Sequence, residues 1–219
     1  MRDALPDLQV PPGAALRAVV YDAARADQWA GWLSDEERCR IKRFGAERRV
    51  REFIAGRAAA RRLLADRLNT SPMAVRLRVA DDGAVEVPHT PWHLSIAHTG
   101  PNDAPRAVAV CAPYALAIDV EQIQPRSPDL RQFLFAPHDR ALPDALPHNE
   151  NTSLLLCWTL KEAVLKARRS GFRCSPKRIQ LTIDAEARTA TAQVEAQAWE
   201  LRYTQWDNAW CAVAWSRPM

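Results

Sequence analysis

Long apolar runs are missing from this sequence of 219 residues. No stretch approaches the roughly 20 apolar residues that a membrane-spanning helix needs. The N-terminus carries Arg2 and Asp3 and has no apolar segment of the length that a signal peptide requires. We therefore expect a cytoplasmic protein that has no membrane partner.

Cysteine pairs are missing as well. The five cysteines are odd in number and scattered, and no two of them have the C-x-x-C spacing. The pattern indicates neither a zinc site nor a disulfide framework, and a reducing compartment fits it best. The cysteines are Cys39, Cys111, Cys157, Cys174 and Cys211.

The composition is ordinary for a globular protein, with 47% hydrophobic and 26% charged residues. The length suffices for one large domain or two small ones. The net charge is only +4, but basic residues crowd the segment between Arg38 and Arg62. A local basic patch of this kind predicts an anionic partner: a nucleic acid, a phosphorylated cofactor or an acidic protein.

The order of the expected elements predicts a mixed α+β fold. Ser34-Asp35-Glu36-Glu37 is typical of a capping box at a helix start. Longer helices are expected over 46–68 and 152–170, the second ended by Gly171. The chain divides near residue 112 into halves 1–112 and 113–219, each with a long helix and a small, mostly antiparallel sheet. The expected strands are 15–21, 75–79, 84–87, 93–98, 107–111, 115–121, 179–183, 191–194, 199–205 and 210–215.

Two carboxylates stand in an apolar segment, Ala117-Ile118-Asp119-Val120-Glu121. In a strand their spacing of two places both on one face, with Ile118 and Val120 on the other. Taken alone, this pattern is also typical of a solvated strand face.

A third carboxylate lies in the segment Trp158-Thr159-Leu160-Lys161-Glu162-Ala163-Val164-Leu165-Lys166. Glu162 and Lys166 are spaced i, i+4 on one stripe of the expected helix, one turn past Trp158. Taken alone they could be an ordinary surface pair. Three carboxylates that converge, with a lysine one turn away, suit a magnesium ion and a phosphate ester.

These segments together resemble the 4′-phosphopantetheinyl transferases of the larger, two-lobe type that activates surfactin synthetase. The combination of Asp119-x-Glu121 with Trp158-x-x-Lys161-Glu162-Ala163-x-x-Lys166 carries the resemblance. Leu94-Ser95-Ile96-Ala97-His98-Thr99-Gly100 resembles the family's histidine segment. Phe53-Ile54-Ala55-Gly56-Arg57-x-x-x-Arg61 resembles its basic helix.

The resemblance implies transfer of 4′-phosphopantetheine from coenzyme A to a serine of an acyl or peptidyl carrier protein, with release of 3′,5′-ADP. It implies dependence on magnesium, with manganese as an alternative. It also implies two similar α+β halves related by pseudo-twofold symmetry, with the site between them, in a monomer. The carrier and its pathway (fatty-acid, polyketide or nonribosomal peptide) stay open.

Roles for individual residues follow from the same resemblance. Glu162 would accept the serine proton and Lys166 would contact the phosphate, with Asp119 also in the catalytic group. The residues matched to coenzyme A binding are Arg51, Arg57, His98, Thr99 and Lys166. The residues matched to the metal are Asp119, Glu121 and Glu162.

Three positions depart from the family pattern and bear on coenzyme A affinity. Ala117 stands where glycine is usual, and Ala97 stands where serine is common beside His98. The usual basic residue of a G-[KR]-P segment is replaced by Ala84, after Gly83.

Other functions remain open on the residues alone. The same carboxylates could serve another magnesium-dependent phosphotransferase or a nuclease, although the sequence has no P-loop. A non-catalytic module that binds nucleic acid or a carrier protein is a further alternative. The tryptophans are interpreted as packing residues, and Phe133 and Phe135 as packing residues or as a docking surface for a carrier helix.

Overall fold

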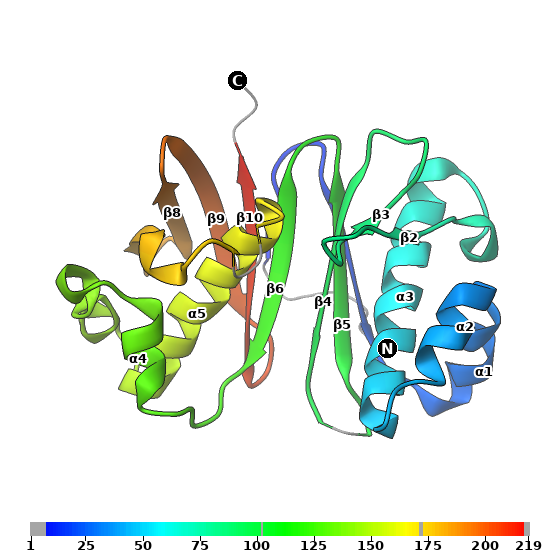
Figure 1. Ribbon diagram of the computed structural model, residues 1–219, viewed down its shortest axis with the longest axis horizontal. Coiled ribbons are helices and arrows are strands. Elements are labelled where there is room, and N and C mark those ends of the chain that lie inside the picture. The colour runs from blue at the N-terminus through cyan, green and yellow to red at the C-terminus, as the bar shows by residue number, and fades with distance from the viewer. Residues whose placement is uncertain (1–7, 102, 171–172, 217–219) are drawn as a thin grey trace. The chain divides into compact units, whose positions relative to one another are not determined.

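The computed structural model describes residues 8–101, 103–170 and 173–216. The fold is mixed α+β, as the order of the expected elements predicted (Figure 1). The chain divides into two compact units, one comprising Pro12–Pro113 and the other running from Tyr114 onward. Residues 8–11 belong to the second unit, although the sequence analysis placed them in the first half.

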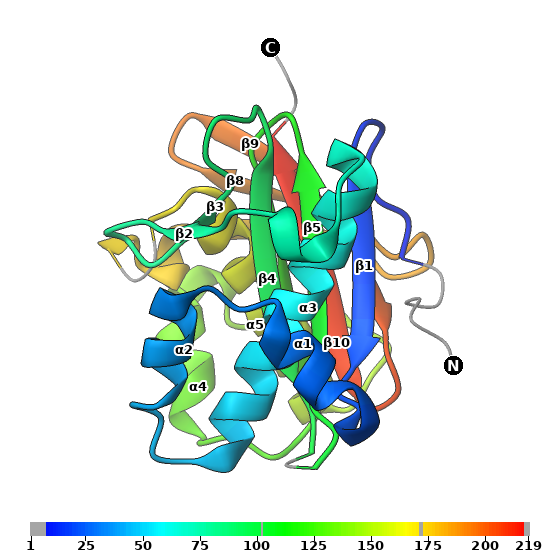
Figure 2. The ribbon, with the colours of Figure 1, turned by 90° about the vertical axis from the view of Figure 1, so that its right-hand side faces the viewer.

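The first unit contains a three-stranded antiparallel sheet in the order β1-β5-β4. Its strands are β1 (Ala15–Val20), β4 (His93–Thr99) and β5 (Arg106–Ala112). The long helix α3 (Glu47–Leu68) lies against all three strands (Figure 2). This unit therefore has the expected arrangement of a small antiparallel sheet packed on a long helix.

Small residues let α3 approach the sheet closely. Ala55, Ala58 and Ala59 are buried on its inner side. A Cβ added at Gly56 would lie 3.0 Å from Cγ2 of Ile96 on β4, a distance at which the isoleucine must move. The helix ends at Leu68, and the cap residue Asn69 has a left-handed backbone (φ 48°), a common helix terminator.

Shorter elements complete the first unit. The helices α1 (Ala26–Gly31) and α2 (Asp35–Ile41) pack on α3. The hairpin of β2 and β3 turns at Gly83, whose φ of 84° favours glycine. The remaining bounds are β2 (Arg78–Val79), β3 (Val85–Glu86) and the 3₁₀ turns η1 (Ala23–Arg25) and η2 (Pro72–Ala74).

The capping box predicted at Ser34 is present, and its glutamate has a second role. The Glu37 amide donates to Ser34 Oγ at 3.2 Å, and the Ser34 amide donates to Glu37 Oε2 at 3.0 Å. The buried Glu37 carboxylate also pairs with Arg57 Nε and Arg61 Nη2 of α3, each at 2.6 Å. One residue therefore caps α2 and is the shared counter-ion of two buried guanidinium groups.

The second unit contains a five-stranded antiparallel sheet in the order β6-β10-β9-β8-β7. Helix α5 (Glu150–Ala167) begins after Asn149, whose side chain accepts a hydrogen bond from the Thr152 amide. It ends at Ala167, three residues before the predicted end, and Gly171 lies outside the described residues. The strands are β6 (Leu116–Gln122), β7 (Gln180–Asp184), β8 (Thr189–Val194), β9 (Gln197–Gln205) and β10 (Ala209–Ser216).

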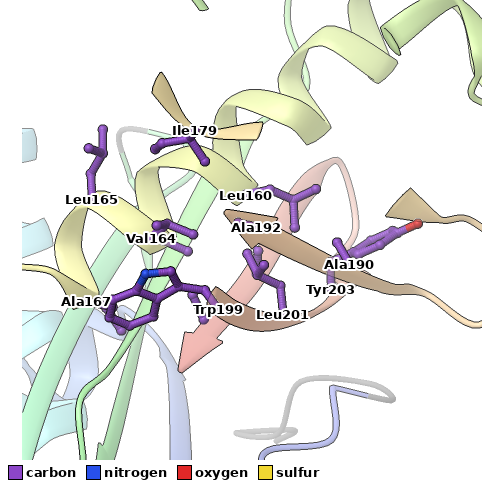
Figure 3. Packing of buried hydrophobic residues seen from close by; sticks show 14 of the residues in the cluster. Leu160, Val164, Leu165, Ala167, Ile179, Ala190, Ala192, Trp199, Leu201 and Tyr203 are labelled. Carbon is purple, nitrogen blue, oxygen red and sulfur yellow. The ribbon is translucent and has the colours of Figure 1, made fainter. Parts of the chain in front are cut away.

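Helix α5 covers one face of this sheet and packs against β6 and β10. Figure 3 shows Leu160 and Val164 of α5 close to Trp199 and Leu201 of β9. Because these side chains are almost fully buried, the position of α5 on the sheet is fixed by apolar packing.

A short helix, α4 (Asp129–Leu134), and several 3₁₀ turns fill the segments around α5. The sequence has only weak helical signals here. Phe135, which follows α4, is fully buried in a small cluster with Leu134, Leu154 and Cys157. The turns are η3 (Pro137–Asp139), η4 (Leu142–Ala145) and η6 (Pro176–Arg178).

Within residues 8–101, 103–170 and 173–216, none of the helices combines the length and the apolar character that crossing a bilayer requires. The pseudo-twofold relation between the halves remains a prediction of the family resemblance.

Removing the charge of Glu37 should destabilise the first unit. In Glu37→Gln, two buried guanidinium groups lose their shared counter-ion, and we expect a loss of about 3–5 kcal/mol in the free energy of unfolding. Urea denaturation followed by circular dichroism measures this loss. Glu36→Gln, at the exposed neighbouring position, should cost about 0.5 kcal/mol or less. Equal losses in the two variants would contradict the role assigned to Glu37.

Candidate active site

Strand β6 and helix α5 bring four charged side chains of the second unit together. Asp119 and Glu121 lie on β6, where they pair with Ala212 and Trp210 of β10. Glu162 and Lys166 lie one turn apart on α5, which packs on these two strands. The juxtaposition predicted from the two motifs therefore arises within one unit.

Lys166 is bound to Asp119. Its Nζ donates a hydrogen bond of 2.6 Å to Asp119 Oδ1, and the aspartate side chain is only 6% exposed. Burial lowers the pKa of Lys166, but the charges of Asp119, Glu162 and Glu121 outweigh burial and raise it. The lysine is therefore a firmly charged group that holds α5 to β6.

Among the four charged residues, Glu162 has the carboxyl group whose pKa is changed most strongly by burial and by neighbouring negative charge. Burial and the charges of Asp119 and Glu121 together raise the pKa of its carboxyl to about 7, with the charge of Lys166 acting in the opposite direction. Within the described residues, Glu162 Oε1 and Asp119 Oδ2 are buried and accept no hydrogen bond. Buried carboxylate oxygens without partners are costly, so the site has capacity for a cation or a proton.

Glu121 has protein partners for both of its oxygens. Trp158 Nε1 donates to Oε1 at 2.9 Å, and Arg126 Nη2 donates to Oε2 at 2.7 Å. Burial and the Asp119 charge raise the pKa of Glu121, while Trp158 and Arg126 counteract them. The charge of Asp119 therefore acts on Glu121, but both oxygens of Glu121 already accept hydrogen bonds from the protein.

The donor chemistry of this cluster suits a hard divalent cation. Among the residues that the structure describes, no group of three or more His, Cys, Asp or Glu side chains is arranged to hold a metal ion. Magnesium, however, is usually bound through one or two protein carboxylates, with waters and substrate phosphates completing its shell. The two unpartnered oxygens, on Asp119 and Glu162, fit that requirement. A ligand role for Glu121 stays a prediction.

A cavity of about 280 Å³ lies directly beside Glu121. Its apolar wall consists of Leu130 and Phe133 from α4 and Trp158 from α5. The rings of Phe133 and Trp158 are 5.8 Å apart between centroids, and Phe133 is 42% exposed. Phe133 thus lines the cavity with a partly exposed ring, whereas Phe135 is a packing residue. The polar lining residues are Glu121, Arg126, Ser127 and Asp129.

Apart from Lys166, the residues predicted to bind coenzyme A lie in the first unit. Arg57 is buried and pairs with Glu37, and its Cζ lies 4.6 Å from the centroid of the Phe53 ring. Burial lowers the pKa of Arg57, and the charge of Glu37 partly offsets this effect. Arg51 pairs with Glu47 at 2.6 Å. The binding roles of both arginines stay predictions.

His98, on β4, is half exposed, and its Nδ1 lies 3.6 Å from Oε2 of Glu52. Glu52, on α3, also accepts a hydrogen bond of 2.8 Å from Arg48 Nε. Thr99 follows His98 and is buried. The binding roles of His98 and Thr99 also remain predictions.

Two residues of the α5 motif do more than the sequence analysis assigned to them. Trp158, interpreted as a packing residue, donates to Glu121 and lines the cavity. Lys161, to which no role was assigned, is buried, and burial lowers its pKa to about 8. Its spacing from Cys157 and Val164, both buried, places Lys161 on the inner side of the helix, and this spacing was visible in the sequence.

The raised pKa of Glu162 predicts how stability changes with pH. A folded-state pKa above the unfolded value means that the folded state holds the proton more tightly, so this stabilisation fades as the pH rises through about 7. Glu162→Gln, which is neutral at every pH, should therefore gain free energy of unfolding relative to the wild type between pH 5 and about pH 8.

Chemical denaturation across this pH range measures the difference. The control is Glu186→Gln, which removes an exposed carboxylate. A difference between wild type and Glu162→Gln that does not change with pH would contradict the environment described for Glu162.

Comparison with known proteins agrees with the chemistry of this cluster. No curated protein matches the chain significantly. The family model of the 4′-phosphopantetheinyl transferase superfamily matches residues 115–214, which include all four charged residues of the site. The second unit is therefore similar to the 4′-phosphopantetheinyl transferase superfamily.

Proposed function

We propose that this protein is a magnesium-dependent phosphopantetheinyl transferase, which moves 4′-phosphopantetheine from coenzyme A to a serine of an acyl or peptidyl carrier protein. The observation that carries the proposal is the cluster of Asp119, Glu162 and Lys166 inside the residues that match the superfamily. The larger, two-lobe monomeric subtype and the cytoplasmic location belong to the same proposal.

The residues suit the bond changes of this reaction. The serine oxygen attacks the phosphorus that bears the pantetheine, and the bond from that phosphorus to the leaving 3′,5′-ADP breaks. Glu162, with a pKa of about 7, is suited to accept the serine proton. Lys166 carries the positive charge that stabilises negative charge developing on the phosphate oxygens.

A magnesium ion would be held by Asp119 and Glu162, with Glu121 as the further predicted ligand, and would neutralise charge on the pyrophosphate. The cavity beside Glu121 offers apolar surface to the pantetheine arm, since that arm is attached to the reacting phosphate. Arg51, Arg57, His98 and Thr99 of the first unit remain the proposed contacts to the coenzyme A phosphates.

Two alternatives are separable from this proposal. Another magnesium-dependent phosphotransferase or a nuclease would release phosphate or cleave nucleic acid without a carrier protein. A non-catalytic nucleic-acid-binding module would need a free basic surface. Pairing of Arg57 and Arg61 with Glu37 removes two of the arginines that suggested such a surface.

The direct test combines the purified protein, coenzyme A, magnesium and apo carrier proteins of the fatty-acid, polyketide and peptide types. We expect at least one carrier to gain the mass of a phosphopantetheine group. Asp119→Asn and Glu162→Gln should each lower the rate by about 10²-fold or more, because charge neutralisation and proton transfer are removed. Glu186→Gln should retain the wild-type rate. Absence of modification on every carrier would refute the proposal.

The contribution of His98 is testable separately. His98→Ala should raise the KM for coenzyme A about tenfold, the effect of one lost hydrogen bond to a charged group, and should change kcat less. Dephospho-coenzyme A, which lacks the 3′-phosphate, locates the contact. If His98 binds the 3′-phosphate, His98→Ala should leave the KM for this analogue unchanged. His138→Ala, which truncates an exposed histidine, is the control. Wild-type KM values in His98→Ala would remove this histidine from the binding site.

A further inference from the structure

A buried lysine joins three segments of the second unit. Lys161 is 1% exposed and lies next to Glu162 on α5. Its Nζ donates to the carbonyl oxygen of Leu134 at 2.7 Å and to that of Pro176 at 2.9 Å. The ammonium group also lies 4.4 Å from the centroid of the Phe135 ring. These contacts compensate a charge that would otherwise be costly to bury.

Both carbonyl groups belong to short helical segments. Leu134 is the last residue of α4, and Pro176 is the first residue of η6. The Leu134 carbonyl lies in the last turn of α4, where carbonyl groups have no partner within the helix, so the lysine donor stabilises this end. The Pro176 carbonyl also accepts a hydrogen bond of 3.1 Å from the Ile179 amide. A helix of six residues is not stable by itself. The position of α4 therefore depends on its contacts with α5.

The segment that Lys161 holds forms one wall of the cavity beside Glu121. Leu130 and Phe133 of α4 line that cavity together with Trp158, whose ring contacts that of Phe133 and which lies one turn before Lys161 on α5. A displacement of α4 would separate Phe133 from Trp158. The same tryptophan donates to Glu121, so the cavity wall and the carboxylate site share one residue.

We infer that Lys161 is a positioning residue, which fixes α4 on α5 and thereby sets the shape of the cavity that Phe133 and Trp158 line. An apolar side chain of similar length would fill the same space at a lower desolvation cost. It would, however, leave the carbonyl of the buried Leu134 without the donor that Lys161 supplies and release the end of α4. The effect of Lys161 on substrate affinity rests on the function proposed above.

The test compares Lys161→Met with Lys177→Met, which replaces an exposed lysine of η6. 4-Fluorophenylalanine placed at Phe133 reports on the ring of Trp158 through its ¹⁹F resonance. We expect one shifted resonance in the wild type and in Lys177→Met. In Lys161→Met the resonance should move toward that of a Trp158→Phe reference, and amide exchange over 129–135 should become about tenfold faster or more.

Lys161→Gln is the second variant if Lys161→Met does not fold, because it keeps a donor but has a shorter reach. An unchanged ¹⁹F resonance together with unchanged exchange in a folded Lys161 variant overturns the inference. Transferase kinetics add a further readout: the KM for coenzyme A should rise at least about fivefold while kcat changes less, because the ligand loses a preformed wall. A moved resonance with an unchanged KM overturns the link to affinity.

Failure of the proposed function would look different. If the wild type modifies no carrier protein, the transferase proposal is refuted. The ¹⁹F resonance and the exchange of α4 still decide whether Lys161 positions the cavity wall.

Discussion

Crowding of negative charge between β6 and α5 is the constraint on which the second unit depends. Burial and mutual repulsion act on Asp119, Glu121 and Glu162, and the fold responds differently to each. Asp119 receives Lys166, and Glu121 receives Trp158 and Arg126. The pKa of Glu162 is raised to about 7, and its Oε1 is buried without a hydrogen bond within the described chain. Such local imbalance is expected at functional sites, where stability is given up for reactivity.

The first unit shows the opposite solution to buried charge. Glu37 is shared by Arg57 and Arg61, and it also caps α2. Here one carboxylate is the shared counter-ion of two guanidinium groups, and the result is a stabilising contact between α2 and α3. The basic segment between Arg38 and Arg62, which suggested an anionic ligand, therefore has a partly structural role. The buried carboxylate oxygens without hydrogen-bond partners, on Asp119 and Glu162, lie in the second unit, within the residues that match the transferase superfamily.

The sequence predicted features that depend on local patterns. The capping box at Ser34, the long helix α3 and the strand around Asp119 follow from short-range spacing, and all of them are present. The sequence could not predict that Glu121 would be bound by Trp158 and Arg126, or that Arg57 would pair with Glu37. The contacts of Trp158 with Glu121 and of Arg57 with Glu37 join residues distant in the chain, and only the packing of α5 on β6 and of α2 on α3 brings them together. Arg126 is only five residues from Glu121, but it lies beyond the end of β6, where no periodic pattern predicts its contact. The sequence indicated helix α4 only weakly, because a helix of six residues is stabilised by tertiary contacts and not by its own local sequence.

The engagement of Glu121 changes how the motif of three carboxylates is understood. A cation entering the cluster would find unpartnered oxygens on Asp119 and Glu162, but on Glu121 it would compete with an indole and a guanidinium donor. Magnesium needs few protein ligands when a pyrophosphate is present, so Glu121 need not be released for a cation to bind. We therefore propose that Glu121 acts chiefly at the boundary between the charged cluster and the apolar cavity. There the hydrogen bond from Trp158 to Glu121 links the cavity wall, which we infer Lys161 positions, to the carboxylates of Asp119 and Glu162.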